Sequence, residues 1–370
     1  MGGKKLSYRR TVLLIIDLNS GGAEWQLARL AESIHAHEMF SILVVGMNGR
    51  GEVYKWLKNR GIPTCCLDYS RPFQIWKLIK LFRVFRSFKP DILHTWMFHA
   101  NILGKIVGKL CGIRYILASL RTAEKERPHH VTLERSTAFL NDRILCNSTG
   151  VRNFAARRGF PQKKLKVIPN SFDSTLFHFS RRNYTYGNSF KILFLGRINP
   201  QKGLEYLIDA AAQLKSWNHP FTIDLTGKTE EPYRSQLRRQ IETFAVESIV
   251  FWKPPIKHTQ IPDLLSQYHL LVLPSLWEGM PNVIMEAFAT GLPVVATRIG
   301  GTNDLVTHQK TGLLVPPSNS RELADRICYA MENYETMQGF AENARDHLLS
   351  NYSHSTIRDA YFGLYESLGA

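Results

Sequence analysis

Several features that mark common classes of protein are absent from this sequence. Its five cysteines are odd in number and form no Cys-x-x-Cys pair, which argues against a disulfide framework or a zinc site and favours a reducing cytoplasm. No apolar run approaches the roughly 20 residues of a membrane-spanning helix. The N-terminal run 11–16 is interrupted by Asp17, and no small-residue cleavage site follows it. It therefore indicates a buried strand and not a signal peptide.

Acidic residues are scarce in the first half of the chain. The whole protein has 47 Lys and Arg against 31 Asp and Glu, a formal net charge of +16. Residues 1–190 hold 31 basic and 12 acidic side chains, net +19, whereas residues 191–370 hold 16 and 19, net −3. The expected partners of the first half are therefore anionic: a membrane surface, a phosphorylated acceptor molecule or nucleic acid.

Short apolar runs recur along the 370 residues, separated by stretches long enough for a helix. This alternation is typical of parallel sheets in an α/β protein, and the length exceeds that of one ordinary domain. The pattern pauses at 171–188, which is polar and aromatic without a clear period. We therefore expect two facing Rossmann-like domains, 1–170 and 189–350, joined by a linker at 171–188. The expected strands are 11–17, 40–46, 90–96, 114–120 and 142–148, then 190–196, 221–227, 248–252, 270–274 and 292–297.

Two glutamates stand eight residues apart in the stretch SLWEGMPNVIMEAFATG. The pattern predicts a loop after the strand 270–274 and then a short helix with Asn282 as its cap and Gly291 at its end. Glu278 then lies on the loop and Glu286 lies one turn inside the helix. Phosphate binds at helix N-termini and at the carboxyl ends of parallel strands. Carboxylates on either side of such a site repel phosphate but accept hydrogen bonds from hydroxyls, which suits a nucleotide sugar. Taken alone, such a pair also arises by chance.

The whole stretch resembles the motif of family 4 retaining glycosyltransferases, which have the GT-B fold. The resemblance implies that Glu278 acts on the donor sugar and pyrophosphate region, and that Glu286 binds the ribose hydroxyls. It also implies that the loop between them binds the phosphates and sugar oxygens through Gly279, Met280, Pro281, Asn282 and Val283. The motif PS-x-x-EG-x-x-x-x-x-x-EA-x-x-x-G-x-PVVA stands here as Pro274-Ser275, Glu278-Gly279, Glu286-Ala287, Gly291 and Pro293-Val294-Val295-Ala296.

The segment LFLGRINPQKG resembles a second anion site of the same family, a strand followed by GR-x-x-x-x-KG. The resemblance implies that Arg197 and Lys202 reach the pyrophosphate and stabilise the leaving nucleotide diphosphate. Without the neighbouring motif, a surface Arg and Lys around a turn would be the simpler interpretation.

The first half resembles the family more thinly. The GGAE segment implies that Gly21 and Gly22 line the cleft from the acceptor side, with Glu24 structural. In PDILHTWMFHANILG, His99 matches a histidine near the donor sugar better than His94, which is expected inside a strand. A lone histidine is more often structural.

Two further segments bear on the ends of the domains. KVIPNSFD stands where the family has N-G-V-D; Asn170 and Asp173 agree with that pattern, while Ser171 and Phe172 depart from it. The segment 351–370 resembles the C-terminal helix that crosses back to the first domain. The resemblance thus implies an acceptor-side domain at 1–170 and a nucleotide-sugar-binding domain at 189–350.

The implied reaction transfers a sugar from a nucleotide diphosphate to an acceptor hydroxyl with retention of configuration. His99, Arg197, Lys202 and Glu278 are the expected catalytic residues, and UDP is favoured by its frequency alone. The chain has no Asp-x-Asp, so we expect no metal and no cofactor beyond the donor. A nucleotide-sugar epimerase of the same architecture is the alternative enzyme. A basic nucleic-acid-binding protein is the alternative of another class, although no nucleic-acid module is present.

A basic and aromatic segment in the first half points to a membrane surface. Its cations recur about every third residue, which gives a broad basic face opposite an apolar one. A packed helix with snorkelling basic ends would look similar. With lipid-linked acceptors in the family, we expect a glycan or lipid-linked acceptor, and a cytoplasmic protein peripheral on the inner face of the membrane. The segment is 71–91, with Phe73, Trp76, Phe82, Phe85 and Phe88 among Lys77, Lys80, Arg83 and Arg86.

Overall fold

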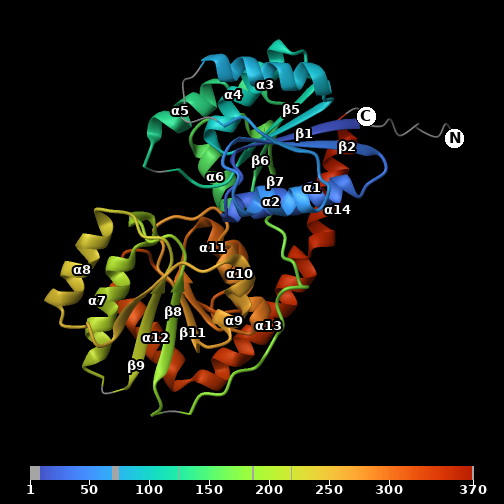
Figure 1. Cartoon of the computed structure of the whole chain (residues 1–370). Helices are drawn as coiled ribbons and strands as arrows, with labels where there is room; N and C mark the ends of the chain where they lie inside the picture. The colour runs from blue at the N-terminus through green and yellow to red at the C-terminus, as the bar shows by residue number, and fades with distance from the viewer. Residues whose placement is uncertain (1–8, 69–74, 125, 186, 218, 369–370) are drawn as a thin grey trace. The chain divides into compact units, whose positions relative to one another are not determined.

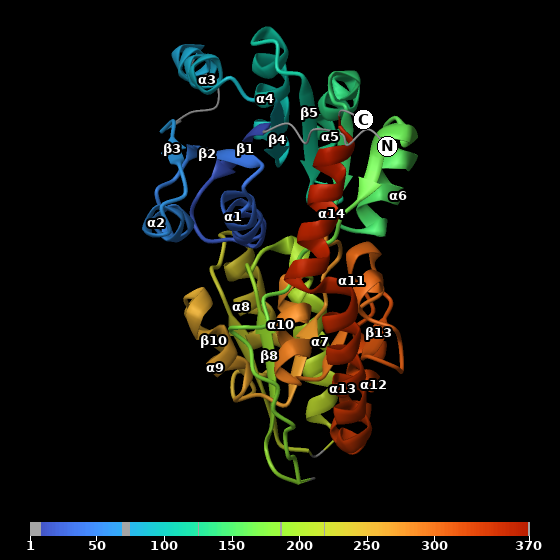
Figure 2. The same cartoon turned by 90° about the vertical axis from the view of Figure 1, so that its right-hand side faces the viewer.

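The computed structural model describes residues 9–68, 75–124, 126–185, 187–217 and 219–368, without the side chains of 75–77. The chain divides into two compact units. Unit 1 is Met1–Asn170 together with Ile357–Ala370, and unit 2 is Ser171–Thr356. Each unit is a parallel sheet with helices on both of its faces (Figures 1 and 2), so the predicted α/β class with two parallel sheets is confirmed.

The sheet of unit 1 has seven strands over the described residues, in the order β3-β2-β1-β4-β5-β6-β7. All of its pairings are parallel. The chain first places β2 and β3 on one side of β1, and it then places β4 on the other side. The strands are β1 Arg9–Asp17, β2 Phe40–Asn48, β3 Thr64–Cys66, β4 Ile92–Trp96, β5 Tyr115–Leu120, β6 Arg143–Cys146 and β7 Leu165–Val167.

Successive residues of β1 face opposite sides of the sheet, as the two-residue period of a strand requires. Leu13 and Ile15 join a core with α1, α2 and α14, whereas Val12 and Leu14 join a second core with α3 and α4. Because both faces are covered, the strand is a continuous apolar run here. The helices of this unit are α1 Gly22–His35, α2 Glu52–Asn59, α3 Ile75–Phe88, α4 Phe98–Leu110, α5 Pro128–Ser136, α6 Thr149–Arg157 and α14 His354–Ser367, with 3-10 turns η1 Ala138–Leu140 and η2 Gln162–Lys164.

Unit 2 repeats the arrangement with six strands in its described part, in the order β10-β9-β8-β11-β12-β13. Helix α7 packs beside α8 and α12, and α10 packs beside α9 and α13. The strands are β8 Phe190–Leu195, β9 Phe221–Thr226, β10 Val250–Lys253, β11 Leu270–Leu273, β12 Val294–Thr297 and β13 Leu313–Val315. The helices are α7 Leu204–Lys215, α8 Tyr233–Thr243, α9 Ile261–Leu265, α10 Asn282–Thr290, α11 Gly300–Leu305, α12 Ser320–Glu332 and α13 Tyr334–Tyr352, with 3-10 turns η3 Pro200–Lys202 and η4 His258–Gln260.

The C-terminal helix α14 returns to unit 1, as expected. The hydroxyl of the buried Tyr365 lies 2.7 Å from Nδ1 of His94 on β4, and His94 Nε2 lies 2.7 Å from the Ser119 hydroxyl on β5. Burial lowers the pKa of His94 to about 3, so the ring is neutral at physiological pH. His94 is therefore a structural residue that fastens α14 to the sheet.

The segment 171–188, expected as a linker, packs against unit 2. Phe172 is buried in the core of unit 2, and its N–H donates to the carbonyl of Tyr352 at 2.8 Å. The guanidinium of Arg182 donates to the carbonyls of Thr290 at 2.7 Å and Leu265 at 3.0 Å. The large side chain at position 172, where the family has a small N-G-V-D turn, thus anchors the segment.

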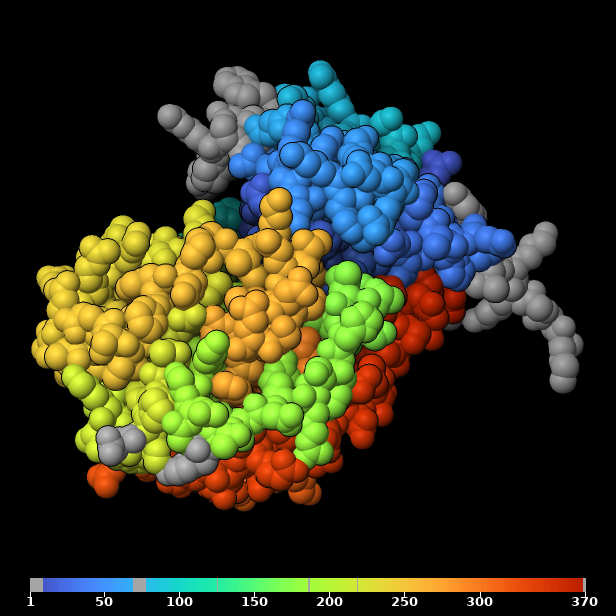
Figure 3. Space-filling view, turned by 60° about the horizontal axis from the view of Figure 1, so that its bottom comes forward, coloured from blue at the N-terminus to red at the C-terminus, as the bar shows by residue number. Residues whose placement is uncertain are grey.

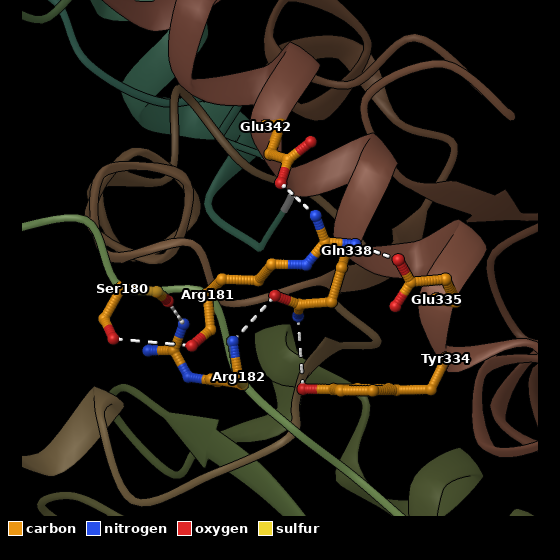
Figure 4. A network of polar contacts seen from close by, with 7 residues as sticks. All are labelled: Ser180, Arg181, Arg182, Tyr334, Glu335, Gln338 and Glu342. Atoms are coloured by element: carbon orange, nitrogen blue, oxygen red, sulfur yellow. Dashed lines mark hydrogen bonds and ion pairs between the residues drawn. The ribbon is translucent and has the colours of Figure 1, made fainter.

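A polar network holds the same segment to α13 (Figure 4). Arg181 pairs with both Glu335 and Glu342, and the backbone N–H of Arg182 donates to Gln338 Oε1 at 2.9 Å. Figure 3 shows the segment, in green, running over the surface of unit 2 beside the red C-terminal helices. Because Arg182 also binds the last residue of α10, the segment is part of the frame that holds this helix.

The ten expected strands are all present with ends shifted by a few residues. Three further strands, β3, β7 and β13, were not expected. Each has only three residues and lies at the edge of its sheet, so it carries too little apolar pattern to stand out. Among the helices that the structure describes, none is both long and apolar enough to cross a bilayer.

Candidate active site

The sheet of unit 2 changes its direction of growth between β8 and β11. From β8 the chain runs to β9 and β10 on one side, and it then returns to place β11, β12 and β13 on the other. Ligands of open α/β sheets bind outside the carboxyl ends of the strands at such a point. Arg197 and Lys202 follow β8, and Glu278 follows β11, so the fold brings three predicted residues to this edge.

Lys202 and Glu278 form an ion pair between Nζ and Oε1. The same Oε1 accepts a 2.7 Å hydrogen bond from the Ser275 hydroxyl, and Gln201 Nε2 lies 3.5 Å from Oε2. The Lys202 and Glu278 side chains are only 13% and 8% exposed. Charges buried to this degree need a partner, since breaking a buried pair costs about 3–5 kcal/mol. The two side chains therefore hold each other in place at this edge of the sheet.

A close approach of two loops brings the pair together. Gly203 sits between η3 and α7 in the left-handed region, with φ +60, and a Cβ there would lie 2.5 Å from the Pro274 carbonyl oxygen. The N–H of Leu276 donates to the Gln201 carbonyl at 2.8 Å. Only glycine fits both the backbone angle and the space, which explains the glycine after Lys202 in the sequence pattern.

Helix α10 begins one residue earlier than the sequence pattern predicts. Pro281 is the N-cap, with an extended backbone, and Asn282 is the first helical residue, so Asn282 is not the cap. Proline takes that place because its φ of −75 suits the turn into the helix. Gly291 ends the helix with φ +76, as predicted. Of the loop residues, Gly279, Met280 and Pro281 are buried, and Asn282 and Val283 are half-buried.

The loop before α10 also rests against α11. A Cβ on Gly301 would lie 1.7 Å from the Gly279 carbonyl oxygen, so this position admits no side chain. The start of α10 is thereby held between α11 and the strand that precedes it. The N-terminus of a helix carries N–H groups with no partner inside the helix and a positive dipole end, which together favour an anion.

Glu286 lies in the second turn of α10 and is 9% exposed. Its Oε1 lies 3.6 Å from Nε2 of His258, which comes from η4 after β10. The two side chains are 11% and 12% exposed. Glu286 is thus fixed from a second element, whereas the sequence presented it as an isolated carboxylate.

Arg197 differs from the other predicted residues of unit 2. It follows β8 directly and is exposed, and within the described residues its side chain makes no hydrogen bond or ion pair. A cation at this edge without an internal partner is available for an anionic ligand. The described residues contain no group of three or more His, Cys, Asp or Glu placed to hold a metal ion.

The two predicted glycines of the first half, Gly21 and Gly22, lie at the start of α1 in unit 1. Gly21 is the N-cap and Gly22 the first helical residue. A Cβ on Gly21 would lie 2.3 Å from Glu24 Oε2, so the carboxylate of Glu24 folds back over the cap. Glu24 is 8% exposed and faces the charge of Arg121. Its structural role agrees with the prediction, while the role of the two glycines stays a prediction.

His99 is the second residue of α4, directly after β4. It lines a cavity of about 170 Å³ within unit 1. Burial and the charge of Arg127 lower the pKa of His99, which favours a neutral ring. Its predicted role near the donor sugar stays a prediction.

Sequence reasoning missed several residues of these sites. Ser275 lies inside the recognised motif but gave no separate signal. Gln201 contacts Glu278 across 77 positions of the chain, and His258 contacts Glu286 across 28. No local sequence pattern predicts contacts between such distant residues. Arg121 is half-buried, with its guanidinium 4.5 Å from the centre of the Trp96 ring, and only the fold reveals this contact.

Two family models match the chain and divide it close to the boundary between the units. The model described as Glycosyltransferase Family 4 matches residues 20–176, and the model described as Glycosyl transferases group 1 matches residues 178–347. This chain belongs to the family 4 glycosyltransferases. The enzyme class predicted from the two motifs is confirmed, and it displaces the alternative of a basic nucleic-acid-binding protein.

Characterised relatives of this glycosyltransferase cover different parts of it. The α-D-kanosaminyltransferase of Streptomyces kanamyceticus is 33% identical over 178 residues, which are 48% of this chain and 46% of the relative. The UDP-Gal:α-D-GlcNAc-diphosphoundecaprenol α-1,3-galactosyltransferase of Escherichia coli is 25% identical over 312 residues, 79% of each chain. The chain thus spans less than half of the first relative and about four fifths of the second.

Solved structures share the fold over nearly the whole chain. HepE from Anabaena, in complex with UDP-glucose, has a TM-score of 0.84 at 24% identity and covers 97% of this chain and 100% of its own. Sucrose-phosphate synthase from Thermosynechococcus elongatus has a TM-score of 0.81 at 19% identity, covering 97% and 99%. With the two parallel-sheet units, this likeness identifies the GT-B fold.

Proposed function

We propose that this glycosyltransferase moves a sugar from a UDP-sugar to a hydroxyl of a glycan or lipid-linked acceptor, with retention of configuration and without a metal ion. The observation that carries the proposal is the Lys202–Glu278 pair beside the start of α10 at the carboxyl edge of unit 2. The edge offers cations and helix N–H groups for a diphosphate, and carboxylates for hydroxyls. The E. coli relative named above uses UDP-galactose and a lipid diphosphate, which supports this choice.

Donor binding follows from the chemistry of the edge. The diphosphate lies against Arg197, Lys202 and the first N–H groups of α10. Glu286 accepts hydrogen bonds from the ribose hydroxyls, and His258 keeps its carboxylate in position. Glu278 accepts a hydrogen bond from a sugar hydroxyl through Oε2, the carboxylate oxygen that does not pair with Lys202. Each group thus contacts the part of the donor that matches its charge.

The same cations drive the reaction. As the glycosidic bond breaks, negative charge grows on the leaving phosphate oxygen, and Arg197 and Lys202 stabilise it in place of a divalent ion. The acceptor hydroxyl attacks the anomeric carbon on the face that the phosphate leaves, and its proton passes to that phosphate oxygen. Bond formation on the same face retains the configuration. Positioning and charge stabilisation supply most of the rate.

The test is turnover with a panel of UDP-, GDP- and ADP-sugars in the presence of EDTA, with methyl glycosides and undecaprenyl-linked sugars as acceptors. We expect nucleoside diphosphate release with one UDP-sugar, unaffected by EDTA, and a product with the donor's anomeric configuration by NMR. An inverted product or loss of activity in EDTA would overturn the corresponding part of the proposal. Interconversion of the donor sugar without any acceptor would indicate an epimerase.

We also propose that the acceptor is met at an anionic membrane surface, through the outer face of α3. Ile79 and Phe82 are 48% and 38% exposed there, beside the exposed Lys80, Arg83 and Arg86. Apolar side chains among cations are the pattern of a helix lying in a membrane interface. Phe85, expected on this segment, instead packs in the core and anchors the helix. Phe73 lies outside the described residues, as do the side chains of Trp76 and Lys77.

Co-sedimentation with vesicles tests this surface. We expect binding to vesicles of phosphatidylcholine with 30% phosphatidylglycerol, weakened by salt and by the double substitution Lys80→Glu and Arg83→Glu. The matched control is Lys163→Glu with Lys166→Glu, an exposed pair outside α3. Binding that ignores salt, or that both double variants weaken equally, would argue against α3 as the docking face.

A further inference from the structure

The segment 171–188 contacts the ring of His258 in unit 2. Phe177, which is buried in the core of this unit, lies edge-on to the His258 ring, with the two ring centres 6.5 Å apart. Aromatic rings at such separations attract each other in this orientation. Since His258 lies 3.6 Å from the Glu286 carboxylate, the segment reaches the Glu286–His258 pair, although neither sequence motif includes it.

Arg182, on the same segment, joins the ends of two helices. Its guanidinium donates to the carbonyl of Thr290, the last residue of α10, at 2.7 Å, and to that of Leu265, the last residue of α9, at 3.0 Å. The last carbonyls of a helix have no partner inside it and carry partial negative charge, so one cation satisfies both ends. Helix α10 carries Glu286, and α9 directly follows η4, which carries His258. The guanidinium therefore ties together the two elements that present this pair.

Arg182 is itself held in place through its backbone (Figure 4). It is 9% exposed, and its N–H donates to Oε1 of the fully buried Gln338 at 2.9 Å. Gln338 Nε2 in turn donates to the Tyr334 hydroxyl at 3.2 Å. Burial lowers the pKa of Arg182, yet a guanidinium stays charged in proteins. Arg182 is thus a fixed buried cation between two helix ends and not a mobile surface charge.

We propose that Arg182 and Phe177 are positioning residues for donor binding. Arg182 holds α9 and α10 at the spacing at which His258 keeps the Glu286 carboxylate directed at the ribose hydroxyls, and Phe177 limits rotation of the His258 ring. The inference rests on the proposed function, because that function assigns the ribose hydroxyls to Glu286. Neither residue is catalytic, since each acts through the pair that it supports.

The neighbouring Arg181 provides a matched control. Its guanidinium pairs with Glu335 and Glu342, which both lie on α13, and its side chain is 46% exposed. Exposed ion pairs of this kind contribute little to stability. Arg181→Ala therefore removes a guanidinium one position away and leaves the carbonyl contacts of Arg182 in place.

A purely structural role for Arg182 makes different predictions from a positioning role. Arg182→Lys keeps the cation but lacks the planar fork that reaches both carbonyls. In a structural role this change only lowers the free energy of unfolding, and the folded variant binds UDP as the wild type does. In a positioning role the folded variant binds UDP more weakly, and the loss requires the ribose hydroxyls.

The experiment is calorimetric titration of UDP and of 2′,3′-dideoxyuridine diphosphate into the full-length wild type, Arg182→Lys, Phe177→Leu and Arg181→Ala, with folding checked by circular dichroism. We expect UDP binding to weaken about three- to tenfold in Arg182→Lys and about threefold in Phe177→Leu. Arg181→Ala should bind UDP like the wild type, and the dideoxy analogue should bind all four proteins alike. Phe177→Leu removes no charge, so it decides the question if Arg182→Lys does not fold.

A second measurement reports on the position of His258 without any donor. In protein containing carbon-13-labelled histidine, the NMR resonance of the His258 ring is assigned by its loss in His258→Gln. We expect this resonance to shift in Arg182→Lys and to stay in place in Arg181→Ala.

Two results would overturn the inference while leaving the proposed function intact. One is equal UDP binding by all four proteins, and the other is a loss in Arg182→Lys and Phe177→Leu that is just as large for the dideoxy analogue. If the wild type binds no UDP but the His258 resonance shifts in Arg182→Lys alone, the proposed function is contradicted and the positioning of His258 stands. An unchanged resonance without UDP binding would contradict both.

Discussion

The two units carry different kinds of side chain at the same place in the same kind of sheet. At the carboxyl edge of unit 2, Lys202 and Glu278 are buried as a charged pair next to a helix N-terminus. At the carboxyl edge of unit 1, the cavity combines aromatic and aliphatic side chains with charged ones such as Glu124, Arg127 and Glu134, and burial raises the pKa of Glu134 to about 7.

The net charge of the two halves would suggest that an anion site lies in the first half. Residues 1–190 are strongly basic and residues 191–370 are slightly acidic, yet the cations that we propose bind the diphosphate lie in the acidic half. Most of the basic surplus, such as Lys80 and Arg83, is on the surface of unit 1. A few positioned charges define an anion site, whereas net charge describes how a surface attracts large partners.

The largest effect is expected from Lys202→Ala, which should disrupt the charged edge of unit 2 alone. It leaves Glu278 buried without its ion-pair partner and removes a cation from the leaving phosphate. We expect kcat to fall about 10²–10³-fold and the free energy of unfolding to fall by about 3 kcal/mol. Kinetics and urea unfolding measure both. The double variant Lys202→Met with Glu278→Leu should recover much of the stability and none of the activity. If the double variant is as unstable as Lys202→Ala, the pair is not what holds this edge.

A change at His94 should act on unit 1 alone. Its folded-state pKa of about 3 lies below the ordinary value of 6.5, so the unfolded chain binds more protons between these pH values. The contribution of the neutral His94 ring to the free energy of unfolding is complete above pH 6.5. It is lost as pH falls below that value, at up to about 1.4 kcal/mol per pH unit.

The variant His94→Gln removes this proton linkage. We expect its free energy of unfolding to fall less between pH 7.5 and pH 5 than that of the wild type, by about 2 kcal/mol, in urea titrations. UDP binding at pH 7.5 should be unaffected. An identical pH dependence in variant and wild type would mean that His94 is not buried as a neutral ring.

A smaller effect should sharpen the description of the charged edge of unit 2. His258→Gln loosens the carboxylate of Glu286, and we expect UDP binding to weaken about three- to tenfold. The loss should be absent for 2′,3′-dideoxyuridine diphosphate and in the Glu286→Ala background. Calorimetry on the four proteins of this cycle measures it. A loss that persists without the ribose hydroxyls would place His258 elsewhere in the site.

The sequence predicted the sheets because buried strands leave apolar runs. It singled out Glu278, Glu286, Arg197 and Lys202 because they fall in dense local motifs, and their roles in donor binding stay predictions. It missed β3, β7 and β13, which are short edge strands. It also missed the contacts that join distant segments. The Lys202–Glu278 pair spans 76 positions, and it became visible only when the fold placed β8 beside β11.

The unit 1 cavity was harder still to foresee. Its lining comes from β1, β4, β5, the helices α4, α5 and α6 and the segment after β5, which lie far apart in the sequence. Glu134 in particular reads as a surface glutamate in a short polar helix. Only packing reveals that it is buried against Asn101. Sequence patterns thus report elements and local motifs, while cavities depend on how those elements pack.

Calorimetric titration of UDP, without metal, into wild type, Glu286→Ala and Glu134→Gln tests the central claim most directly. We predict that UDP binds the wild type and Glu134→Gln equally and binds Glu286→Ala at least tenfold more weakly, because we propose that the nucleotide binds at the carboxyl edge of unit 2. Equal binding to all three proteins, or a loss confined to Glu134→Gln, would contradict this division between the two units.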